Sequence, residues 1–327
     1  MSETPNLPLG QLDVISAVQY GTRGYPHDAW TRLRREAPVC WMEPPRYRPF
    51  WAITKHADIV EISKQPDKFR SAGRFILFPE LGGGQNAENM AQDPPLRMLV
   101  NQDPPEHRDF RGLVSKWFTP RSVGRLEPRL EEITREIFDE LAGEGECEFV
   151  GTIAARQPLR MITELLGIPR EKEDFVLRIT NENFGIEDAE FAREGDSRDE
   201  RLAFIQEAFA FLGELLESRR KEPREDLATV LAQATLRGEP VPQFELFSLH
   251  LLIMVAGHDT TRNAISSGLL ALLDHPEEFE KLRRDPSLVD RAADEIVRWT
   301  TPVNHFVRTA TEDYELRGQK IRKGDSA

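Results

Sequence analysis

Residues 255–263, VAGHDTTRN, place a carboxylate next to an alcohol inside an apolar helical stretch. Asp259 is costly to bury unless it is paired or used, and the hydroxyl of Thr260 can both donate and accept a hydrogen bond. In a helix Thr260 can also bond back to the carbonyl of Ala256, which loosens the backbone there. Gly257 has no side chain, so a flat group could approach the backbone closely. These residue types predict a kinked groove for a bound planar group, with an acid and an alcohol placed to relay protons.

Ordinary packing explains the same residues as well. Asp259 could pair with Arg262 or His258, and the threonines could simply fill space. Residue types alone leave both alternatives open, so motifs elsewhere in the chain have to decide between them.

A second group of polar residues precedes this stretch, in DPPEHRDFRGLVSKWFTPR. Asp103 is expected to cap a helix that begins at the next proline, with Glu106 as the reciprocal acid of a capping box. His107 and Arg111 are four residues apart, so they share one helical face and offer two donors to an anionic group. An ordinary solvated helix start would contain the same residues.

A third motif, DEIVRW, follows the central stretch and contains Glu295 and Arg298. Three residues apart on one helical face, the two side chains can form an ion pair. The same spacing of Glu and Arg recurs elsewhere in the chain, at 43/46, 132/135, 190/193, 217/220 and 280/283. Only its place after the other two motifs distinguishes this pair.

The elements that must position these residues are mostly helices. Apolar periodicity and Gly, Pro or Asp breaks predict helices over 104–117, 122–142, 155–166, 171–181, 198–221, 242–274, 276–284 and 287–299. The helix over 242–274 would be about 50 Å long, and because its first half is apolar on nearly every face, it is expected to be buried. Residues 50–65 predict a strand followed by a helix, and turn residues at Arg317-Gly318 and Lys323-Gly324 predict a hairpin.

Composition and charge exclude several classes of protein. With 39% hydrophobic and 30% charged residues the chain is typical of globular proteins, and its net charge of −13 argues against non-specific nucleic-acid binding. The two cysteines, Cys40 and Cys147, show no paired spacing, which favours a reduced, cytoplasmic protein. The start of the chain has no signal-peptide pattern, and the longest apolar run, 251–256, is too short to span a bilayer.

The three motifs in this order resemble the cytochrome P450 family of haem-thiolate monooxygenases, in its soluble bacterial branch. AGHDTT resembles the oxygen-activating stretch of the long central helix, EIVR the E-x-x-R of a later helix, and DPPEHRDFR with FTPR the helix that holds the haem propionates. FWAITKHADIV and PVNHFVRTATEDYELRGQKIRKGD are also similar to family segments.

The resemblance covers nearly the whole chain and implies a mainly α fold with a small β region. It implies a single domain over 1–327, with a β-rich part over about 1–100, a helical part over about 101–300 and the start of a β-hairpin over 301–327.

The resemblance also implies an activity, the hydroxylation of an apolar small molecule with dioxygen and two electrons, on haem b (iron protoporphyrin IX). Asp259 and Thr260 would be the catalytic acid and alcohol, because dioxygen chemistry in a dry site needs protons delivered to it. Glu295 and Arg298 would form a structural ion pair. The haem-binding residues would be His107, Arg111, Ala256, Gly257, Thr260 and Arg308.

The sequence departs from the family at the axial ligand. A haem-thiolate enzyme needs a cysteine in a Gly/Phe-rich loop after the E-x-x-R helix, and no cysteine follows Cys147. Cys40 and Cys147 precede the central helix in other surroundings, so both are expected to pack as small hydrophobes. The end of the chain at KGDSA is interpreted as a C-terminal truncation before the cysteine loop. No metal ligand is therefore expected in this chain, which by itself could be inactive.

The expected substrate is a sterol, a terpenoid or a fatty acyl chain. The apolar run at 74–79 and the segment 182–196 lie where the family places the roof and lid of its pocket. Pockets of this size are mostly apolar in any protein, which weakens the inference. The candidate lining residues are Phe75, Phe78, Val255, Val303 and Phe306.

Electrons are expected from partner proteins, because the sequence contains no flavin or nicotinamide fingerprint. A ferredoxin and a ferredoxin reductase would pass them on, ultimately from NAD(P)H. A strip of basic residues could dock an acidic ferredoxin, or it could be a solvated helix face balanced by Glu127, Glu131 and Glu132. The strip consists of Arg108, Lys116, Arg121, Arg125 and Arg129.

Two other functions remain open. A family relative with peroxide-driven or dehydrating chemistry has less need of a proton relay, so the pair Asp259 and Thr260 disfavours it. A haem-free, non-catalytic fragment acting as a binding module is the alternative that the missing cysteine loop favours.

Overall fold

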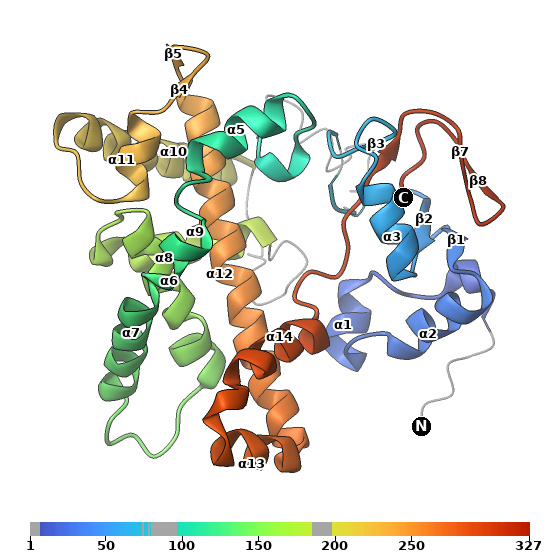
Figure 1. Cartoon of the computed structure of the whole chain (residues 1–327), viewed down its shortest axis with the longest axis horizontal. Coiled ribbons are helices and arrows are strands. Elements are labelled where there is room, and N and C mark those ends of the chain that lie inside the picture. Colours follow the sequence, from blue (N-terminus) through green and yellow to red (C-terminus); the bar gives the residue numbers. More distant parts are fainter. Residues whose placement is uncertain (1–6, 74, 78, 80–96, 185–197) are drawn as a thin grey trace. The chain divides into compact units, whose positions relative to one another are not determined.

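Figure 1 shows the computed structural model, which describes residues 7–73, 75–77, 79, 97–184 and 198–327. Two compact units make up the chain. The first comprises Met1–Arg108 together with His305–Ala327, and the second comprises Asp109–Asn304. Helices predominate over a few short strands, which confirms the predicted mainly α fold with a small β region.

The first unit holds most of the strands. Its helices are η1 (Leu9–Gln11), α1 (Ala17–Arg23), α2 (His27–Glu36), α3 (His56–Ser63) and η2 (Leu99–Asn101). Its strands are β1 (Val39–Met42), β2 (Phe50–Ile53), β3 (Phe69–Arg70), β6 (Thr309–Ala310), β7 (Tyr314–Leu316) and β8 (Gln319–Ile321). They pair in antiparallel twos, as β1-β2, β3-β6 and β7-β8.

Two apolar clusters stabilise these elements. One packs α2 against the β1-β2 ribbon through Leu33, Met42 and Phe50, with Leu77 on its margin. The other packs Phe69 of β3 against Ala310 of β6 and against Leu316 and Ile321 of the β7-β8 hairpin. The predicted hairpin turn is present: Arg317 and Gly318 both adopt positive φ angles, 51° and 75°, which a two-residue turn of this type requires.

The second unit is helical. α5 (Glu106–Val114) crosses the boundary between the units, and the chain continues through α6 (Pro120–Gly124), α7 (Glu127–Glu140), the π-helical turn η3 (Val150–Ala154) and α8 (Arg156–Leu165). Then come η4 (Arg170–Lys172), α9 (Glu173–Phe184), α10 (Arg198–Lys221), α11 (Leu227–Ala232) and the short ribbon of β4 (Thr235–Leu236) and β5 (Glu239–Pro240). α12 (Gln243–Asp274), α13 (Pro276–Arg284), η6 (Pro286–Leu288) and α14 (Val289–Thr300) complete it.

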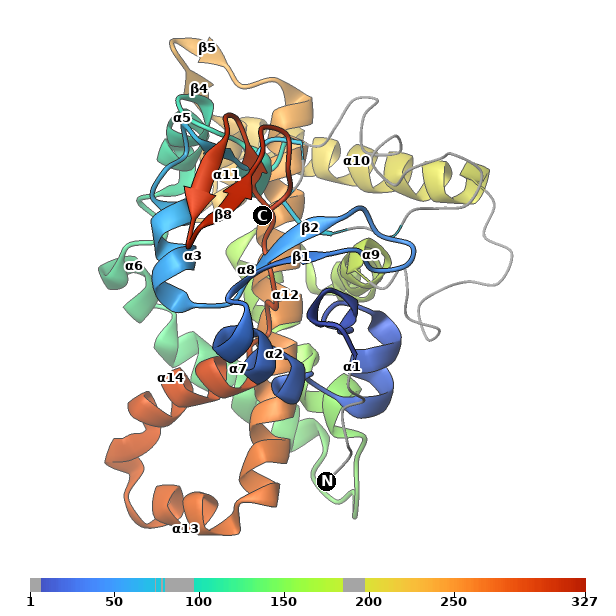
Figure 2. The same ribbon diagram turned by 90° about the vertical axis from the view of Figure 1, so that its right-hand side faces the viewer.

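The 32-residue helix α12 is the axis of this unit. Both views show α8 and α9 beside it and α13 and α14 folded back along its C-terminal end (Figures 1 and 2). The first half of α12 is buried, as its apolar composition predicts, with Leu246, Leu249 and Met254 almost fully covered. Its observed bounds differ from the predicted 242–274 by a single residue.

Two predicted helix starts are wrong. The helix that was expected from Pro104 begins at Glu106, because Pro104 precedes a second proline, which disfavours helical backbone. Asp103 does not cap it; its carboxylate accepts hydrogen bonds from the amides of Ser71 and Ala72, at 2.8 and 3.1 Å. The expected single helix over 122–142 is divided into α6 and α7, since Pro128 lacks the amide proton that a helix interior needs.

In the part of the chain that the structure describes, no helix combines the length and apolar character needed to cross a membrane.

Candidate active site on helix α12

The middle of α12 contains the predicted acid and alcohol in an unbroken helix. Thr260 Oγ1 donates to the carbonyl oxygen of Ala256 at 2.8 Å, and Thr261 Oγ1 donates to that of Gly257 at 3.0 Å. These are the bonds back to the preceding turn that the sequence predicts. The hydroxyl proton of Thr260 is therefore donated within its own helix, to the residue one turn earlier.

Asp259 is held by a neighbouring arginine. Arg262 Nη2 lies 2.5 Å from Asp259 Oδ1, and Asn263 Nδ2 donates to the other carboxylate oxygen at 3.3 Å. Of the two partners considered from sequence, Arg262 is the one the structure contains. The second arm of Arg262 donates to Asn181 Oδ1 in α9 at 3.3 Å. Burial raises the pKa of Asp259, because desolvation outweighs the attraction of Arg262 and the bond from Asn263.

Gly257 lies where α12 packs closely against α8, and this packing leaves no room for a side chain. A Cβ atom at this position would lie 2.9 Å from Ile162 Cδ1 of α8, closer than side chains normally approach. The approach of a flat ligand to the backbone at this turn stays a prediction. The space beside Gly257 is taken by Ile162.

Ala256 and Thr260 form the open side of this turn. Successive helical residues are about 100° apart, so residues four apart lie within about 40° of each other. Ala256 is exposed although the residues just before it, Met254 and Val255, are buried. One turn of α12 thus presents a methyl group and a hydroxyl where larger side chains would cover the backbone. His258 lies on the opposite, packed side.

The predicted anion-binding donors lie on α5 and in the segment just before β6. His107 and Arg111 both lie on α5, with His107 half-buried and Arg111 exposed. Arg308, in the first unit, is half-buried; its Nη1 donates to Val307 O at 2.9 Å and its guanidinium lies 5.8 Å from the centre of the Phe306 ring. Burial lowers the pKa of Arg308. Among the described residues, none of these three side chains has a carboxylate within ion-pair distance.

The residues predicted to line an apolar pocket are divided between the two units. In the first, Phe75 is half-buried and its carbonyl oxygen accepts from Val307 N at 2.7 Å, while Phe306 is exposed. In the second, Val255 is buried within α12 and Val303 is exposed. Phe78 lies outside the described residues.

Glu295 and Arg298 form a two-pronged ion pair on α14. Arg298 Nη2 lies 2.5 Å from Glu295 Oε1, and Nε lies 2.7 Å from Oε2. Both side chains are more than half exposed. The arginine lowers the pKa of Glu295.

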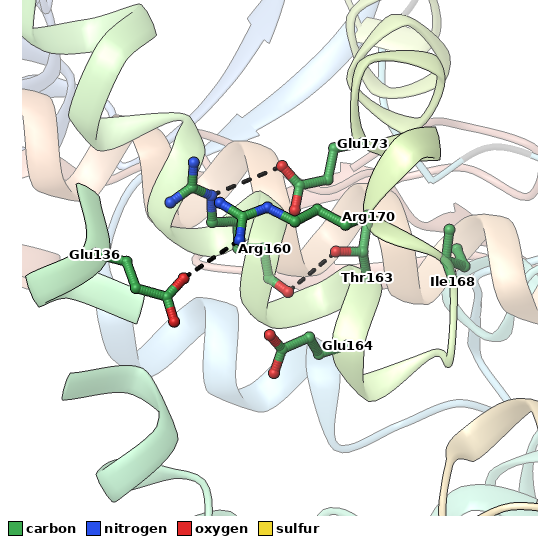
Figure 3. A pocket seen from close by; sticks show the side chains of 7 residues that line it. All are labelled: Glu136, Arg160, Thr163, Glu164, Ile168, Arg170 and Glu173. Atoms are coloured by element: carbon green, nitrogen blue, oxygen red, sulfur yellow. Dashed lines mark hydrogen bonds and ion pairs between the residues drawn. The ribbon is translucent and has the colours of Figure 1, made fainter. Parts of the chain in front are cut away.

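A separate charged pocket lies against α7, α8 and α9 (Figure 3). Its volume is about 40 Å³, and Arg160 and Glu173 face each other in it at 3.7 Å. None of the site residues predicted from the sequence lines it. The lining residues are Glu136, Arg160, Thr163, Glu164, Ile168, Arg170 and Glu173.

Neither cysteine is placed as a metal ligand. Cys40 is buried in β1, where burial raises its thiol pKa, and Cys147 is exposed. A raised pKa favours the thiol over the thiolate that binds metals. Within the described ranges, no cluster of three or more His, Cys, Asp or Glu side chains could hold a metal ion.

The sequence did not predict several contacts of the site that are made between helices. Ile162, Thr180 and Asn181 contact Gly257, His258 and Arg262, respectively, across helices. Such partners depend on how α8 and α9 dock on α12, and no local pattern identifies them.

Comparison with known proteins gives a consistent result. The Cytochrome P450 family model matches residues 192–326. A steroid C26-monooxygenase of Mycolicibacterium smegmatis is 35% identical, over 98% of this chain and 74% of its own length. A linalool 8-monooxygenase of Pseudomonas putida is 35% identical, over 93% of this chain and 74% of its own length.

Solved structures agree. CYP108D1 from Novosphingobium aromaticivorans matches with a TM-score of 0.84 at 32% identity, covering 96% of this chain and 75% of that one. Mycobacterium marinum cytochrome P450 CYP268A2, in complex with pseudoionone, matches with a TM-score of 0.83 at 31% identity, covering 95% and 74%. This chain thus spans about three quarters of the length of these proteins.

Proposed function

The chain belongs to the cytochrome P450 family of haem-dependent monooxygenases, and on that premise we propose that α12 is the distal wall of a haem site in which an apolar small molecule is hydroxylated. The observation that carries the proposal is the pair Asp259 and Thr260 beside the open turn at Ala256. A buried acid next to a hydroxyl is the arrangement that proton delivery into a dry site requires.

The residues present fit one face of a haem and its two carboxylates. The small side chains of Ala256 and Thr260 leave the backbone open to a flat group, with Gly257 at the margin. His107, Arg111 and Arg308 have donors that no described carboxylate uses, and would bind the propionates of haem b. Cys40 is buried in β1 and Cys147 is exposed, and we assign neither as the thiolate ligand of the family. When bound, the haem supplies the activation of dioxygen.

The protein's own contribution would be to hold and move protons. Burial favours the protonated form of Asp259, whose side chain is 20% exposed and so keeps contact with solvent. In this proposal Thr260 Oγ1 turns from the Ala256 carbonyl and donates its proton into the site, and Asp259, the residue before it, takes up protons from solvent to replace it. The ion pair with Arg262 must loosen for Asp259 to do this.

The proposed substrate is an apolar molecule of the sterol, terpenoid or fatty acyl type. The names of two relatives, a steroid monooxygenase and a linalool monooxygenase, support this class. Within this chain, Phe306 and Val303 are exposed apolar side chains and Phe75 is half-buried, and we propose that all three contact such a molecule. Val255 and Phe78 complete the proposed lining.

The proposed electron source is NAD(P)H, through a ferredoxin reductase and an acidic ferredoxin in the cytoplasm. Four residues of the predicted basic strip are exposed, namely Arg108, Lys116, Arg121 and Arg125. The fifth, Arg129, is occupied by ion pairs to Glu132, Glu136 and Glu164, so we leave it out of the docking surface.

Optical titration of the chain with haem b tests the proposal directly. We expect saturable binding that Arg308→Ala and Arg111→Ala each weaken several-fold, since each removes a charge-assisted hydrogen bond. Arg135→Ala, which breaks an exposed ion pair with Glu131 on α7, is the matched control and should leave the affinity unchanged. Absence of saturable binding would overturn the enzymatic proposal in favour of a haem-free binding module.

The proton relay is tested in protein loaded with haem and supplied with electrons. Thr260→Ala should lower the ratio of hydroxylated product to electrons consumed about 10-fold or more, because an alanine cannot pass on a proton. Thr260→Ser should restore most of it. An unchanged ratio in Thr260→Ala would remove the role assigned to the hydroxyl.

A further inference from the structure

His258 stands directly before the catalytic pair and joins α12 to two other elements. It is fully buried. Its Nε2 lies 3.2 Å from the carbonyl oxygen of Ala155, between η3 and α8, and its Nδ1 lies 3.1 Å from Thr180 Oγ1 in α9. One imidazole ring therefore connects three parts of the second unit at the height of Asp259.

The partners fix the ring in one protonation state. A carbonyl oxygen can only accept, so Nε2 carries the proton that is donated to Ala155. Burial lowers the pKa of His258 to about 4, and Arg262 adds to the effect, so the ring is neutral. Nδ1 then accepts the proton of the Thr180 hydroxyl. The Thr180 hydroxyl also lies 2.9 Å from Leu177 O in its own helix. If it donated its proton to that carbonyl instead, Nδ1 of His258 would have no donor.

The direction of these bonds bears on the catalytic residues. At about 100° per residue, Ala256 and Thr260 both lie about 160° from His258, on the opposite side of α12. Any rotation of α12 that moved His258 out of its socket would turn Ala256 and Thr260 toward the packed side. Gly257 restricts the same motion, because Ile162 abuts its backbone.

We propose that His258 is a positioning residue for the proton relay: its bonds to Ala155 and Thr180 fix the rotation of α12 and hence the direction of Asp259 and Thr260. The inference rests on the function proposed for that pair. An apolar residue of similar size could fill the socket, but it would have no directional contact to set the angle of the helix.

Variants of Thr180 test this without touching α12. Thr180→Val removes the hydroxyl at nearly constant shape, and Thr180→Ser keeps it. Thr163→Val is the matched control, because Thr163 is as buried as Thr180 but bonds only to carbonyls of its own helix, Leu159 and Arg160. Any general cost of losing a buried hydroxyl appears in both valine variants.

The first readout is amide hydrogen exchange over residues 256–262. We expect Thr180→Val to speed it about fivefold, the equivalent of one net hydrogen bond, and Thr180→Ser and Thr163→Val to change it less than about twofold. Equal effects of the two valine variants, or none, would overturn the proposal. So would a ¹⁵N spectrum of the wild-type ring showing the proton on Nδ1.

The second readout is the ratio of product to electrons in the haem-loaded protein, which should fall in Thr180→Val and stay constant in Thr163→Val. Equal ratios in the two would count against positioning. If the wild-type chain takes up no haem, the proposed enzymatic function fails, while the exchange comparison still decides whether His258 fixes α12.

Discussion

Arg262 and Asp259 form a 2.5 Å ion pair one turn apart on α12, and the free arm of the arginine reaches Asn181 of α9 at 3.3 Å. The acid of the proposed relay is thus held by a residue that is itself held by another helix. Both side chains are mostly buried, so their attraction is screened less than that of a surface pair.

Arg262→Ala should shift the pH dependence of the relay. Arg262 lowers the pKa of Asp259 against the larger effect of burial, so its removal raises that pKa further. Asp259 then stays protonated to higher pH, and the ratio of product to electrons should hold to higher pH than in the wild type. Arg135→Ala, at an exposed pair on α7, is the control. A profile shifted toward acid would contradict the assignment.

Gly257→Ala should lower the free energy of unfolding by about 1 kcal/mol. Overpacking against Ile162 costs about 1–3 kcal/mol, and the better helix propensity of alanine returns about 1 kcal/mol. Ile162→Val removes the Cδ1 atom that lies 2.9 Å from the added carbon, so it should rescue the variant. Chemical denaturation of the single and double variants measures the coupling.

Gly112→Ala on α5 provides the matched control for that measurement. A Cβ at this position meets nothing within 4 Å, so only the gain in helix propensity remains and the variant should be more stable by up to about 1 kcal/mol. If both glycines responded alike, packing against Ile162 would not be the reason for Gly257.

The apolar periodicity of the sequence predicted the bounds of the helices better than the contacts between distant residues. α10 and α13 have the predicted bounds, 198–221 and 276–284, and α12 nearly so, because long apolar periodicity and the residues that end a helix are local signals. The predicted cap at Asp103 was wrong because its carboxylate binds amides about thirty residues away. A local rule cannot foresee that competition.

In the site, too, contacts within one helix were predicted and contacts between helices were not. The bonds of Thr260 and Thr261 to the carbonyl oxygens one turn earlier were predicted correctly, since they depend only on spacing along one helix. The sequence left the partner of Asp259 open between Arg262 and His258, because the choice depends on which side of α12 faces α9. The docking of Thr180 against His258 settles that choice.

Buried histidines should make the protein less stable in acid. Burial lowers the pKa of His250, as of His258, from 6.5 to about 4. Between pH 6.5 and pH 4 these histidines are protonated in the unfolded chain and neutral in the native state. The free energy of unfolding therefore falls as pH decreases over this range. The full shift corresponds to about 3 kcal/mol for each histidine.

His250→Leu should flatten this fall, and because His250 Nε2 has no hydrogen-bond partner, the variant should cost little stability at neutral pH. The pH dependence of urea unfolding measures both effects. His56→Leu, at an exposed histidine on α3, should keep the wild-type slope. A wild-type slope in His250→Leu would show that the imidazole is not shielded from protons.

Arg160, which lines the charged pocket of Figure 3, pairs with Glu173 in that pocket and with Glu140 outside its lining, and the two glutamates should respond to pH in opposite ways. Burial raises the pKa of Glu173, so its ionisation destabilises the native state as pH rises above 4.5 through the raised pKa. Glu140 is half-exposed, and the hydrogen bond that it accepts from Arg160 lowers its pKa. Its contribution to the stability of the native state is therefore present above pH 4.5 and is lost as the pH falls through the lowered pKa.

Glu173→Gln should therefore leave stability unchanged or raised near neutral pH, and remove the decline above pH 4.5. Glu140→Gln should lower stability near neutral pH by about 1 kcal/mol, since it takes a charged partner from the buried Arg160. Urea unfolding across the acidic range separates the two, because their differences from wild type have opposite signs. If both variants lowered stability near neutral pH, Glu173 would neutralise Arg160 in the native state together with Glu140, and the effect assigned to Glu173 would be wrong.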